Sequence, residues 1–309
     1  MIISASYKTD IPTFYGPWFM ERLRAGYCKV LNPYNSKTQT VLLTKEAVEG
    51  IVFWTKNVGP MMKYLPEISD MGFPFVIQHT ITGYPRALET SVTDAAKAIA
   101  YVRQIAERCG QRCVVWRYDP ILFTDLTSAQ WHISNFSMLA RQLSGLTDEV
   151  VVSFATFYQK TQRNLEKAAK ENGFRWSDPA RTQKVEILSR FVEISAAHGL
   201  QLTVCAQPEN LVPGAKEAHC IDAQRLAELR GAPIKAKFHG NRPGCECAEA
   251  RDIGEYDTCP HGCVYCYAVR DPDLAHRRHR AHDPKSEFLF PPPSQTQDAT
   301  EIGDQPRLL

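Results

Sequence analysis

One short loop of the sequence concentrates residues that can do chemistry. Residues 259–266 read CPHGCVYC, so Cys259, Cys263 and Cys266 follow the spacing CxxxCxxC. Three thiolates on one loop can bind three irons of a cubane iron–sulfur cluster and leave the fourth iron open to a small molecule. Tyr265, just before the last cysteine, can cover such a cluster from solvent. We therefore expect an open-site iron–sulfur cluster here.

Zinc is the main alternative at this loop. Tetrahedral Zn²⁺ takes four ligands in a structural site, so Cys247 or His261 would have to complete the set. Catalytic dithiol chemistry is a further alternative. Gly262, inside the motif, lets the backbone wrap closely around a bound group because it has no Cβ.

Cysteines are unevenly distributed along the rest of the chain. There are ten, and seven lie from position 205 onward, which in a reducing cytosol favours a metal site over disulfides. The four outside the loop are Cys205, Cys220, Cys245 and Cys247. Four thiolates can hold a second, fully ligated iron–sulfur cluster or a structural zinc ion. The alternative is that Cys205 or Cys220 is a small buried apolar residue, the role expected for Cys28, Cys109 and Cys113.

Polar residues gather where the predicted strands end. Lys56, Arg117 and Asp119 directly follow or end apolar runs, and Asp10 follows the first strand. The carboxyl ends of parallel strands form the active face of α/β folds, and Lys or Arg there can hold a carboxylate or phosphate. These residues are candidate catalytic contacts, with a buried ion pair between strands as the structural alternative. Further cofactor contacts are expected from Thr80, Thr82 and Gln207.

Short apolar strands alternate with helical stretches over residues 1–235, which is typical of a parallel sheet buried on both faces. Strands are predicted at 1–7, 50–55, 74–81, 113–118, 149–155 and 200–206. Helices are predicted at 91–109, 128–143 and 181–198. A complete eight-stranded barrel needs ~250 residues, so we expect an α/β fold with a partial (β/α)6 TIM-like barrel. A doubly wound sheet is the structural alternative.

Composition changes twice beyond this barrel. Residues 236–283 are rich in Cys, His, Gly and Pro and are expected to form a module packed on the barrel. Residues 284–309 are Pro-rich and polar, so a mostly disordered tail is expected, within which 288–290 can dock. An inserted hairpin is predicted over 28–43.

The overall composition excludes several classes of protein. The 309 residues are 44% hydrophobic with a net charge of +2, so no global field favours nucleic acid or an anionic membrane. No apolar run reaches the roughly 20 residues of a membrane span, and residues 1–12 lack the pattern of a secretory signal. A cytoplasmic protein is expected. The basic stretch 276–282 is interpreted as a solvated helix face rather than a nucleic-acid contact.

With Tyr265 before its last cysteine, the motif resembles the signature CxxxCxΦC (Φ aromatic) of radical S-adenosylmethionine (SAM) enzymes. The resemblance implies an α/β barrel and a [4Fe–4S] cluster whose open iron chelates the methionine part of SAM. Reduction by a donor such as flavodoxin or ferredoxin would cleave SAM to a 5′-deoxyadenosyl radical, which abstracts hydrogen from the substrate.

Two features depart from the radical SAM pattern. The motif follows the last predicted strand, whereas in ordinary radical SAM enzymes it follows the first. In addition, VFWTKN (residues 52–57) stands after the second predicted strand, where a Gly-Gly-Glu motif normally holds the SAM amino group.

Nearly the whole chain, roughly residues 1–290, resembles an uncharacterised bacterial family catalogued as a domain of unknown function, number 1848. The matching segments are SASYKTDIP, VFWTKN, RYDPI, CID at 220–222 and DIGEYDTCPHGCVYCYA at 252–268. The family is noted for a C-terminal cysteine cluster similar to the radical SAM one and supplies no activity. We expect a radical SAM-like enzyme with two [4Fe–4S] clusters and a small-molecule substrate. The rivals are a SAM-independent iron–sulfur enzyme and a zinc-stabilised nucleic-acid-binding protein.

Overall fold

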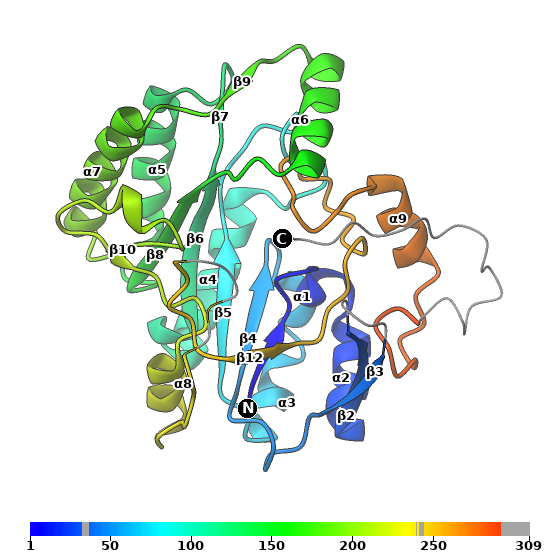
Figure 1. Cartoon of the computed structure of the whole chain (residues 1–309). Helices are drawn as coiled ribbons and strands as arrows, with labels where there is room; N and C mark the ends of the chain where they lie inside the picture. Colours follow the sequence, from blue (N-terminus) through cyan, green and yellow to red (C-terminus); the bar gives the residue numbers. More distant parts are fainter. Residues whose placement is uncertain (33–36, 239, 241–243, 292–309) are drawn as a thin grey trace.

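A parallel β-sheet forms the centre of the computed structural model, which describes residues 1–32, 37–238, 240 and 244–291. The sheet has eight strands in the order β11-β10-β8-β6-β5-β4-β1-β12 (Figure 1). Their bounds are β1 Ile2–Ala5, β4 Gly50–Thr55, β5 Phe75–Thr80, β6 Val114–Ile121, β8 Glu149–Phe154, β10 Gln201–Val204, β11 Lys216–Glu217 and β12 Ala250–Asp252. The prediction of an α/β fold with a parallel sheet is confirmed.

All six predicted strands are present, as β1, β4, β5, β6, β8 and β10. They occupy consecutive places in the sheet in chain order, so the sheet is wound in one direction over these strands. A doubly wound sheet would reverse direction at a switch point among them. β12 comes last in the chain and lies beside β1, at the edge of the sheet.

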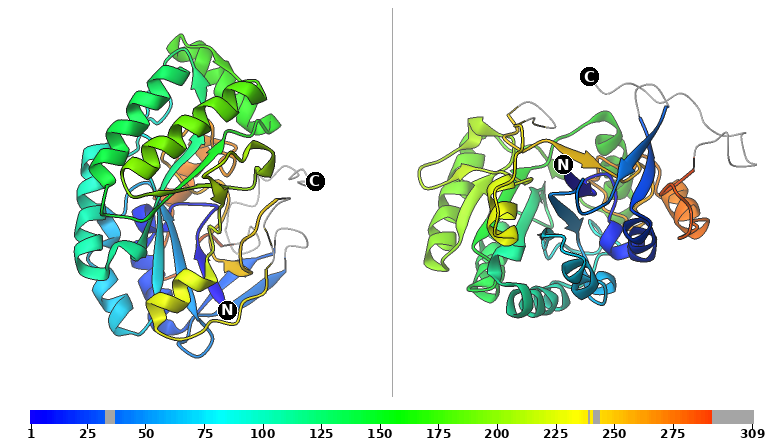
Figure 2. Two further views of the ribbon diagram at one scale, coloured as in Figure 1. Left: turned by 90° about the vertical axis from the view of Figure 1, so that its left-hand side faces the viewer. Right: turned by 90° about the horizontal axis from the view of Figure 1, so that it is seen from below.

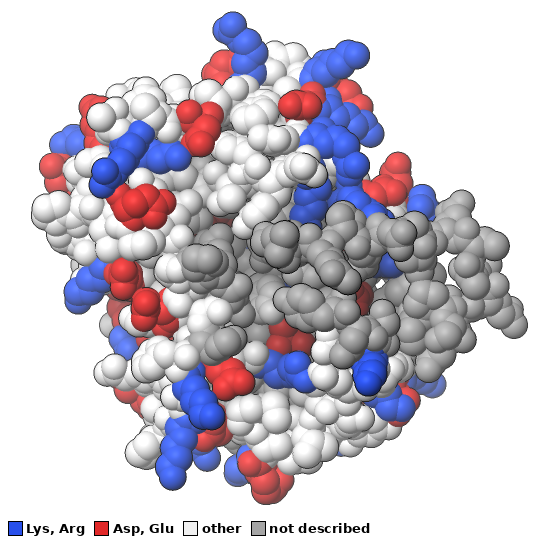
Figure 3. All heavy atoms as spheres, in the orientation of Figure 1, with Lys and Arg blue, Asp and Glu red and all other residues white. Residues whose placement is uncertain are grey.

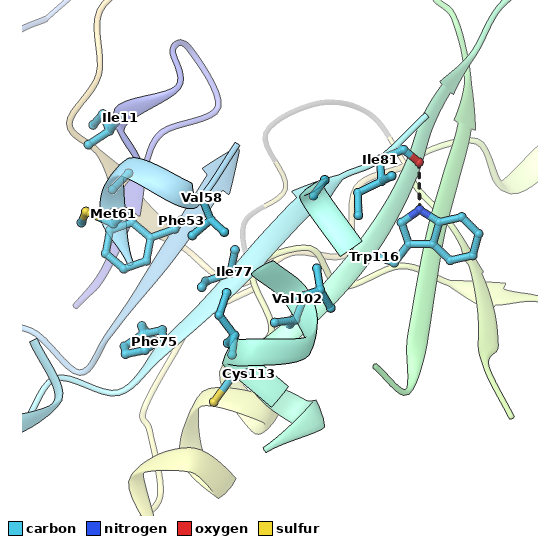
Figure 4. Close-up of a cluster of buried hydrophobic side chains, with 14 of the residues drawn as sticks. Ile11, Phe53, Val58, Met61, Phe75, Ile77, Ile81, Val102, Cys113 and Trp116 are labelled. Carbon is cyan, nitrogen blue, oxygen red and sulfur yellow. Dashed lines mark hydrogen bonds between the residues drawn. The ribbon is translucent and has the colours of Figure 1, made fainter. Parts of the chain in front are cut away.

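Alternate residues of each strand point to opposite faces of the sheet, and both faces are apolar. The outer face carries Phe53, Ile77 and Trp116, which pack with residues of α4, α5 and α7 (Figures 2 and 4). The inner face carries Val76 and Val115, which pack in a separate cluster with Leu226 of α8 and several cysteines; its members are Ile2, Val52, Val76, Val115, Val151, Ala218, Cys220, Ile221, Leu226, Cys247 and Ala248. Burial on both faces explains why the strands read as continuous apolar runs.

The three predicted helices are confirmed as α4 Ala95–Cys109, α5 Ala129–Leu143 and α7 Arg181–Ala197. The remaining helices are α1 Ile11–Phe14, α2 Gly16–Ala25, α3 Leu65–Asp70, α6 Gln159–Asn172, α8 Ala223–Arg230 and α9 Pro272–Arg280, with 3₁₀ turns at Gly59–Met61, Gln111–Cys113 and Pro208–Asn210. Asp222 caps α8 by accepting a hydrogen bond from the Arg225 N–H at 3.0 Å. The described part of the chain contains no helix long and apolar enough to cross a membrane.

Two antiparallel pairs lie outside the central sheet. The predicted hairpin is confirmed as β2 Tyr27–Leu31 and β3 Thr38–Leu42, and residues 33–36 between them lie outside the described residues. The short strands β7 Phe123–Thr124 and β9 Trp176–Ser177 form the second pair.

Residues 284–291 pack against α2 and the hairpin, so this part of the predicted tail belongs to the folded domain. Trp18 Nε1 donates to the Ser286 carbonyl at 2.9 Å, and Lys29 pairs with Glu287 at 2.6 Å. Phe288 and Leu289 are buried. These two apolar side chains dock the segment on the domain, although its composition is otherwise polar. Residues 292–309 lie outside the described residues.

We expect Phe136→Ala to lower the free energy of unfolding by about 3–5 kcal/mol, because it leaves a cavity in the outer-face core. Phe136 is fully buried, and its ring stacks on Phe191 with centroids 3.9 Å apart. Chemical denaturation followed by circular dichroism measures the loss. Met138→Ala on the same helix is the control, because Met138 is 41% exposed and its removal should change stability by less than about 0.5 kcal/mol. A loss below about 1 kcal/mol for Phe136→Ala would contradict this packing.

Candidate functional site

β12 brings the cysteine loop to the carboxyl end of the sheet. It pairs in parallel with β1, with Asp252 opposite Ser4, and residues 253–271 then lead into α9 (Figure 1). Asp252 fixes this edge, because its carboxylate accepts hydrogen bonds from the hydroxyls of Ser4 and Ser6, each at 2.8 Å, and from the Tyr7 N–H at 3.0 Å. The loop after β12 therefore lies beside the loop after β1.

The three thiols of the motif are neighbours in this loop. After burial, the nearby Cys266 raises the pKa of both Cys259 and Cys263, and Cys259 also raises that of Cys263. The Cys266 N–H donates to the Cys263 carbonyl at 3.1 Å. Burial is the main cause that raises the pKa of all three thiols. A metal centre would replace their protons, because the thiolate is the ligand.

Gly262 allows the loop to approach the segment between β5 and α4. Its φ of +69° is left-handed, and a Cβ there would lie 3.1 Å from Cβ of Thr90. Three backbone hydrogen bonds anchor the loop to this segment. The Ser91 N–H donates to the His261 carbonyl at 2.9 Å, the Val264 N–H to the Leu88 carbonyl at 3.1 Å and the Thr90 N–H to the Gly262 carbonyl at 3.5 Å. Gly262 therefore packs closely against the Thr90 side chain, where a larger residue would have no room.

Asp10 connects the cysteine loop to β4. Its Oδ2 lies 2.8 Å from Nε2 of His261 and accepts from the Lys56 N–H at 2.8 Å, while Oδ1 accepts from the Thr13 N–H at 2.9 Å and caps α1. Burial alone would raise the pKa of Asp10, but hydrogen bonding and the charge of His261 outweigh it and lower that pKa. Both carboxylate oxygens have protein partners, so Asp10 positions the loop.

A buried ion pair lies under the same loop. Lys56 Nζ is 2.7 Å from Oε1 of Glu89, which also accepts from the Thr82 hydroxyl at 2.8 Å and from the Tyr265 hydroxyl. Burial alone would lower the pKa of Lys56, but the charges of Glu89 and Cys263 raise it above its usual value. The ammonium therefore stays charged beside Cys263. Lys56, Thr82 and Tyr265 are thus brought together, as predicted residues of one site.

Arg117 and Asp119 form a second ion pair on the inner face. Arg117 Nη2 lies 2.6 Å from Oδ2 of Asp119, and Ser153 donates to the other carboxylate oxygen. Arg117 Nη1 lies 3.0 Å from Sγ of Cys220. After burial, Glu89 and Cys263, the charge of Asp119 also acts on the pKa of Lys56 and raises it, so the two ion pairs interact electrostatically.

The other four late cysteines gather on the inner face, in one apolar cluster. Sγ of Cys205 and Sγ of Cys220 are 3.5 Å apart, and Cys247 Sγ accepts from the Ile221 N–H at 3.4 Å. A hydrogen bond with Cys205 lowers the pKa of Cys220, but the contact with Cys247 and burial raise it to about 11. Cys247 in turn contacts Cys245. The four thiols form a continuous chain of contacts, which we call the four-cysteine group.

Other predicted residues have structural partners. Gln207 accepts from the N–H of Phe154 at 2.8 Å and donates to its carbonyl at 3.0 Å, which fixes the end of β8. Thr80 ends β5, beside Arg117 in register. The Cys113 thiol donates to the Cys109 carbonyl at 2.9 Å, near the amino end of β6 and away from the site.

The basic stretch 276–282 forms most of α9 and the turn after it. Arg278 Nη1 donates to the Tyr256 carbonyl at 2.8 Å, and its guanidinium lies 4.7 Å from the ring centroid of Phe290. Part of the basic charge therefore packs within the C-terminal module. Over the face drawn in Figure 3, acidic and basic side chains are interspersed.

Three buried residues of the site carry little signal in the sequence. Glu89 falls in a loop, and Asp252 ends a strand of three residues that is too short to recognise. Gln78 is a polar interruption of the apolar strand β5. Only this last pattern, an amide within an apolar run, could have identified its residue beforehand.

The donor set suits an iron–sulfur cluster by its chemistry, because thiolates are the ligands such clusters take. Within residues 1–32, 37–238, 240 and 244–291, no three His, Cys, Asp or Glu side chains converge as ligands of a single metal ion. A cubane cluster holds its thiolates further apart than one ion does, because each thiolate binds a different iron. Lys56 and Arg117 supply buried positive charge beside the two groups.

This fold and these loops define an α/β protein whose parallel sheet carries two groups of cysteines near its carboxyl end. The chain belongs to the family described as domain of unknown function DUF1848, whose model matches residues 2–268. The match includes both ion pairs and all seven late cysteines. No curated protein matches the chain.

We expect Lys56→Met to destabilise the protein by about 3–5 kcal/mol, because it leaves the buried Glu89 carboxylate without its cation. Glu89→Gln should have a similar cost for the opposite reason. The double variant should be clearly more stable than the sum of the two losses implies, since neither charge is then left unpaired. Urea denaturation of the four proteins in a double-mutant cycle measures this coupling. Strictly additive losses would show that the pair contributes nothing.

Proposed function

We propose that this protein is a radical SAM-like iron–sulfur enzyme whose [4Fe–4S] cluster is held by Cys259, Cys263 and Cys266. The observation that carries the proposal is the position of their loop in the sheet. The loop directly follows β12, the edge strand beside β1, and leads into α9. This unit therefore precedes β1 in the spatial order of the sheet, and in radical SAM enzymes the motif likewise follows the first strand.

This position accounts for the first departure from the radical SAM pattern. In the proposed scheme, the chain forms a partial barrel of radical SAM type in which the strand that comes first in space, β12, comes last in the sequence. This order also bears on the second departure. If β12 counts as the first strand in space, its neighbour β1 counts as the second. The segment after the second strand, where the Gly-Gly-Glu motif is expected, is then residues 6–10 and not VFWTKN.

The chain's own residues hold and balance such a cluster. When reduced by a flavodoxin or ferredoxin, the cluster would supply the electron that cleaves SAM and starts hydrogen abstraction from a small substrate. Lys56 offsets the negative charge of the thiolates, since its ammonium is charged and lies beside Cys263. Asp10 holds the loop through His261, and Glu89 holds it through Tyr265. His261, Glu89 and Tyr265 are buried, whereas the three cysteines are partly exposed.

The proposal includes a second, fully ligated cluster in the four-cysteine group. Its support is the gathering of four thiols in one cluster, with the buried guanidinium of Arg117 3.0 Å from Sγ of Cys220. The 3.5 Å between Sγ of Cys205 and Sγ of Cys220 is closer than a cubane places its thiolates. Zinc is the alternative occupant, since it takes four thiolates in structural sites.

One observation favours a second candidate function. VFWTKN and residues 6–10 both lack Gly-Gly-Glu, which leaves the SAM amino group without its usual partner. The open iron would then bind the substrate directly and act as a Lewis acid. SAM dependence separates the two candidates.

Metal content tests the cluster assignment. Anaerobically purified and reconstituted protein should contain iron and sulfide, and replacing Cys259, Cys263 and Cys266 together by Ser should remove about four irons per chain, one cubane. Cys109→Ser with Cys113→Ser is the matched control and should remove none. Stoichiometric zinc without iron in the unaltered protein would contradict the assignment.

SAM cleavage tests the activity. We expect the dithionite-reduced protein to form 5′-deoxyadenosine from SAM, as measured by liquid chromatography, and the variant without the three loop cysteines to form none. The same protein with a full cluster but no 5′-deoxyadenosine, and no change of its electron paramagnetic resonance signal on adding SAM, would favour the SAM-independent candidate.

A further inference from the structure

Two lysine side chains flank the ring of Tyr256 beside the cysteine loop. Lys8 follows β1, and its Nζ lies 5.4 Å from the ring centroid; Lys160 stands in the first turn of α6, and its Nζ lies 5.5 Å from the same centroid. Tyr256 itself lies between β12 and Cys259 in the chain. The two ammoniums are therefore near neighbours. Since like charges repel, an anion that contacts both would stabilise the arrangement.

Hydrogen bonds hold the start of α6 against the end of the cysteine loop (Figure 1). The side chains of Arg163 and Asn164 each donate to a backbone carbonyl of residues 269–270 at 3.1 Å. Burial raises the pKa of Cys266, whereas backbone hydrogen bonds and then nearby lysines, Lys160 among them, lower it. Lys160 is therefore close enough to the loop to act on one of its thiols.

Tyr267 links Lys8 to the same thiol. It follows Cys266 in the chain, and its hydroxyl donates to the carbonyl of Tyr7, the residue before Lys8. Tyr267 is 44% exposed, so it presents an aromatic surface to solvent. Cys266, this exposed ring and the two lysines thus lie in one region.

Within the described residues, neither lysine forms a hydrogen-bonded ion pair. Lys8 Nζ lies 3.8 Å from Oδ1 of Asp252, which is beyond hydrogen-bond distance, and that oxygen already accepts two shorter hydrogen bonds. The other contact of Lys8 is the Gly254 carbonyl at 3.5 Å. Glu255 is also near Lys8, and burial raises the pKa of that carboxyl against the opposite effect of Lys8. Lys160 has no carboxylate partner in the described part of the chain, so positive charge is left for a ligand.

We propose that Lys8 and Lys160 form an anion-binding subsite beside the cysteine loop, and that this subsite takes a phosphate or carboxylate group of the substrate. The inference rests on the proposed function and names its substrate class, a small molecule with one such anionic group. A lysine ammonium is a point charge with three donors, which suits the oxygens of either group. Held there, the substrate lies near Cys266 and the proposed cluster, with the exposed ring of Tyr267 next to its uncharged part.

Anion binding to the full-length, reconstituted protein tests the subsite. Inorganic phosphate and succinate are titrated separately by isothermal titration calorimetry at low ionic strength, because salt screens such charges. At least one of the two should bind, and the one that binds identifies the anionic group of the substrate. Lys8→Met and Lys160→Met should each weaken that binding about tenfold. Lys8→Arg and Lys160→Arg should weaken it less, because they keep the charge.

Lys167→Met on the same helix is the matched control, because the Lys167 side chain is 73% exposed and pairs with Glu171. It should leave the affinity for the anion unchanged. If Lys8→Met does not fold, Lys160→Met carries the test. Failure of both anions to bind, an unchanged affinity in Lys160→Met, or an equal loss in Lys167→Met would overturn the subsite.

SAM also carries a carboxylate, so its binding is measured in the same variants and should be unchanged. A loss of SAM affinity in Lys8→Met and Lys160→Met, with phosphate or succinate displacing SAM, would assign the lysines to the cofactor and overturn the substrate subsite. The two proposals fail separately. Anion binding that depends on both lysines, in a protein that takes up no iron, would support the subsite and contradict the cluster. An iron-loaded protein that cleaves SAM but binds neither anion would contradict the subsite alone.

Discussion

The pairing of β12 with β1 is the constraint on which the rest of the site depends. Parallel pairing sets the direction in which the chain leaves the sheet, and three residues of ladder with one buried carboxylate, Asp252, are sufficient to fix it. From that point the cysteine loop can reach only the carboxyl end. Both ion pairs, Lys56 with Glu89 and Arg117 with Asp119, also lie toward that end. The scaffold and the two groups of cysteines therefore meet because a late strand returns to an early one.

Much of the scaffold could be predicted from the sequence, because a strand that is buried on both faces consists of consecutive apolar residues. The six strands were recognisable as apolar runs, the three helices by the spacing of their apolar residues, and the hairpin by its turn residues. β12 could not be predicted in this way. It has three residues, one of them exposed, and it is held by a partner far away in the chain. Its place beside β1 puts the cysteine loop, which comes late in the chain, next to the loop after the first strand.

The residue types of the candidate site could be predicted from the sequence, but the contacts between them could not. Lys56, Arg117 and the seven late cysteines stand out because charge or thiol interrupts an apolar context. Asp10 also stands out, and in the structure it contacts His261 and the Lys56 N–H, which connects the cysteine loop to β4. Glu89 was not predictable, because a carboxylate in a loop has no distinctive pattern in the sequence. Gln78 interrupts an apolar strand and could have been noticed, but its partners could not. Buried polar groups require such partners, and those partners come from other elements.

The late return of β12 also has a consequence during protein synthesis. Ser4 and Asp252 are 248 residues apart in the chain, and at about 5–20 residues per second a ribosome needs on the order of ten to fifty seconds to pass from one to the other. During that interval β1 presents an unpaired edge, a feature that invites wrong pairing. The thiols of Cys259 to Cys266 emerge after this edge is ready to be covered. The loop that carries these thiols is therefore completed only after the strand that covers the edge of the sheet has been made.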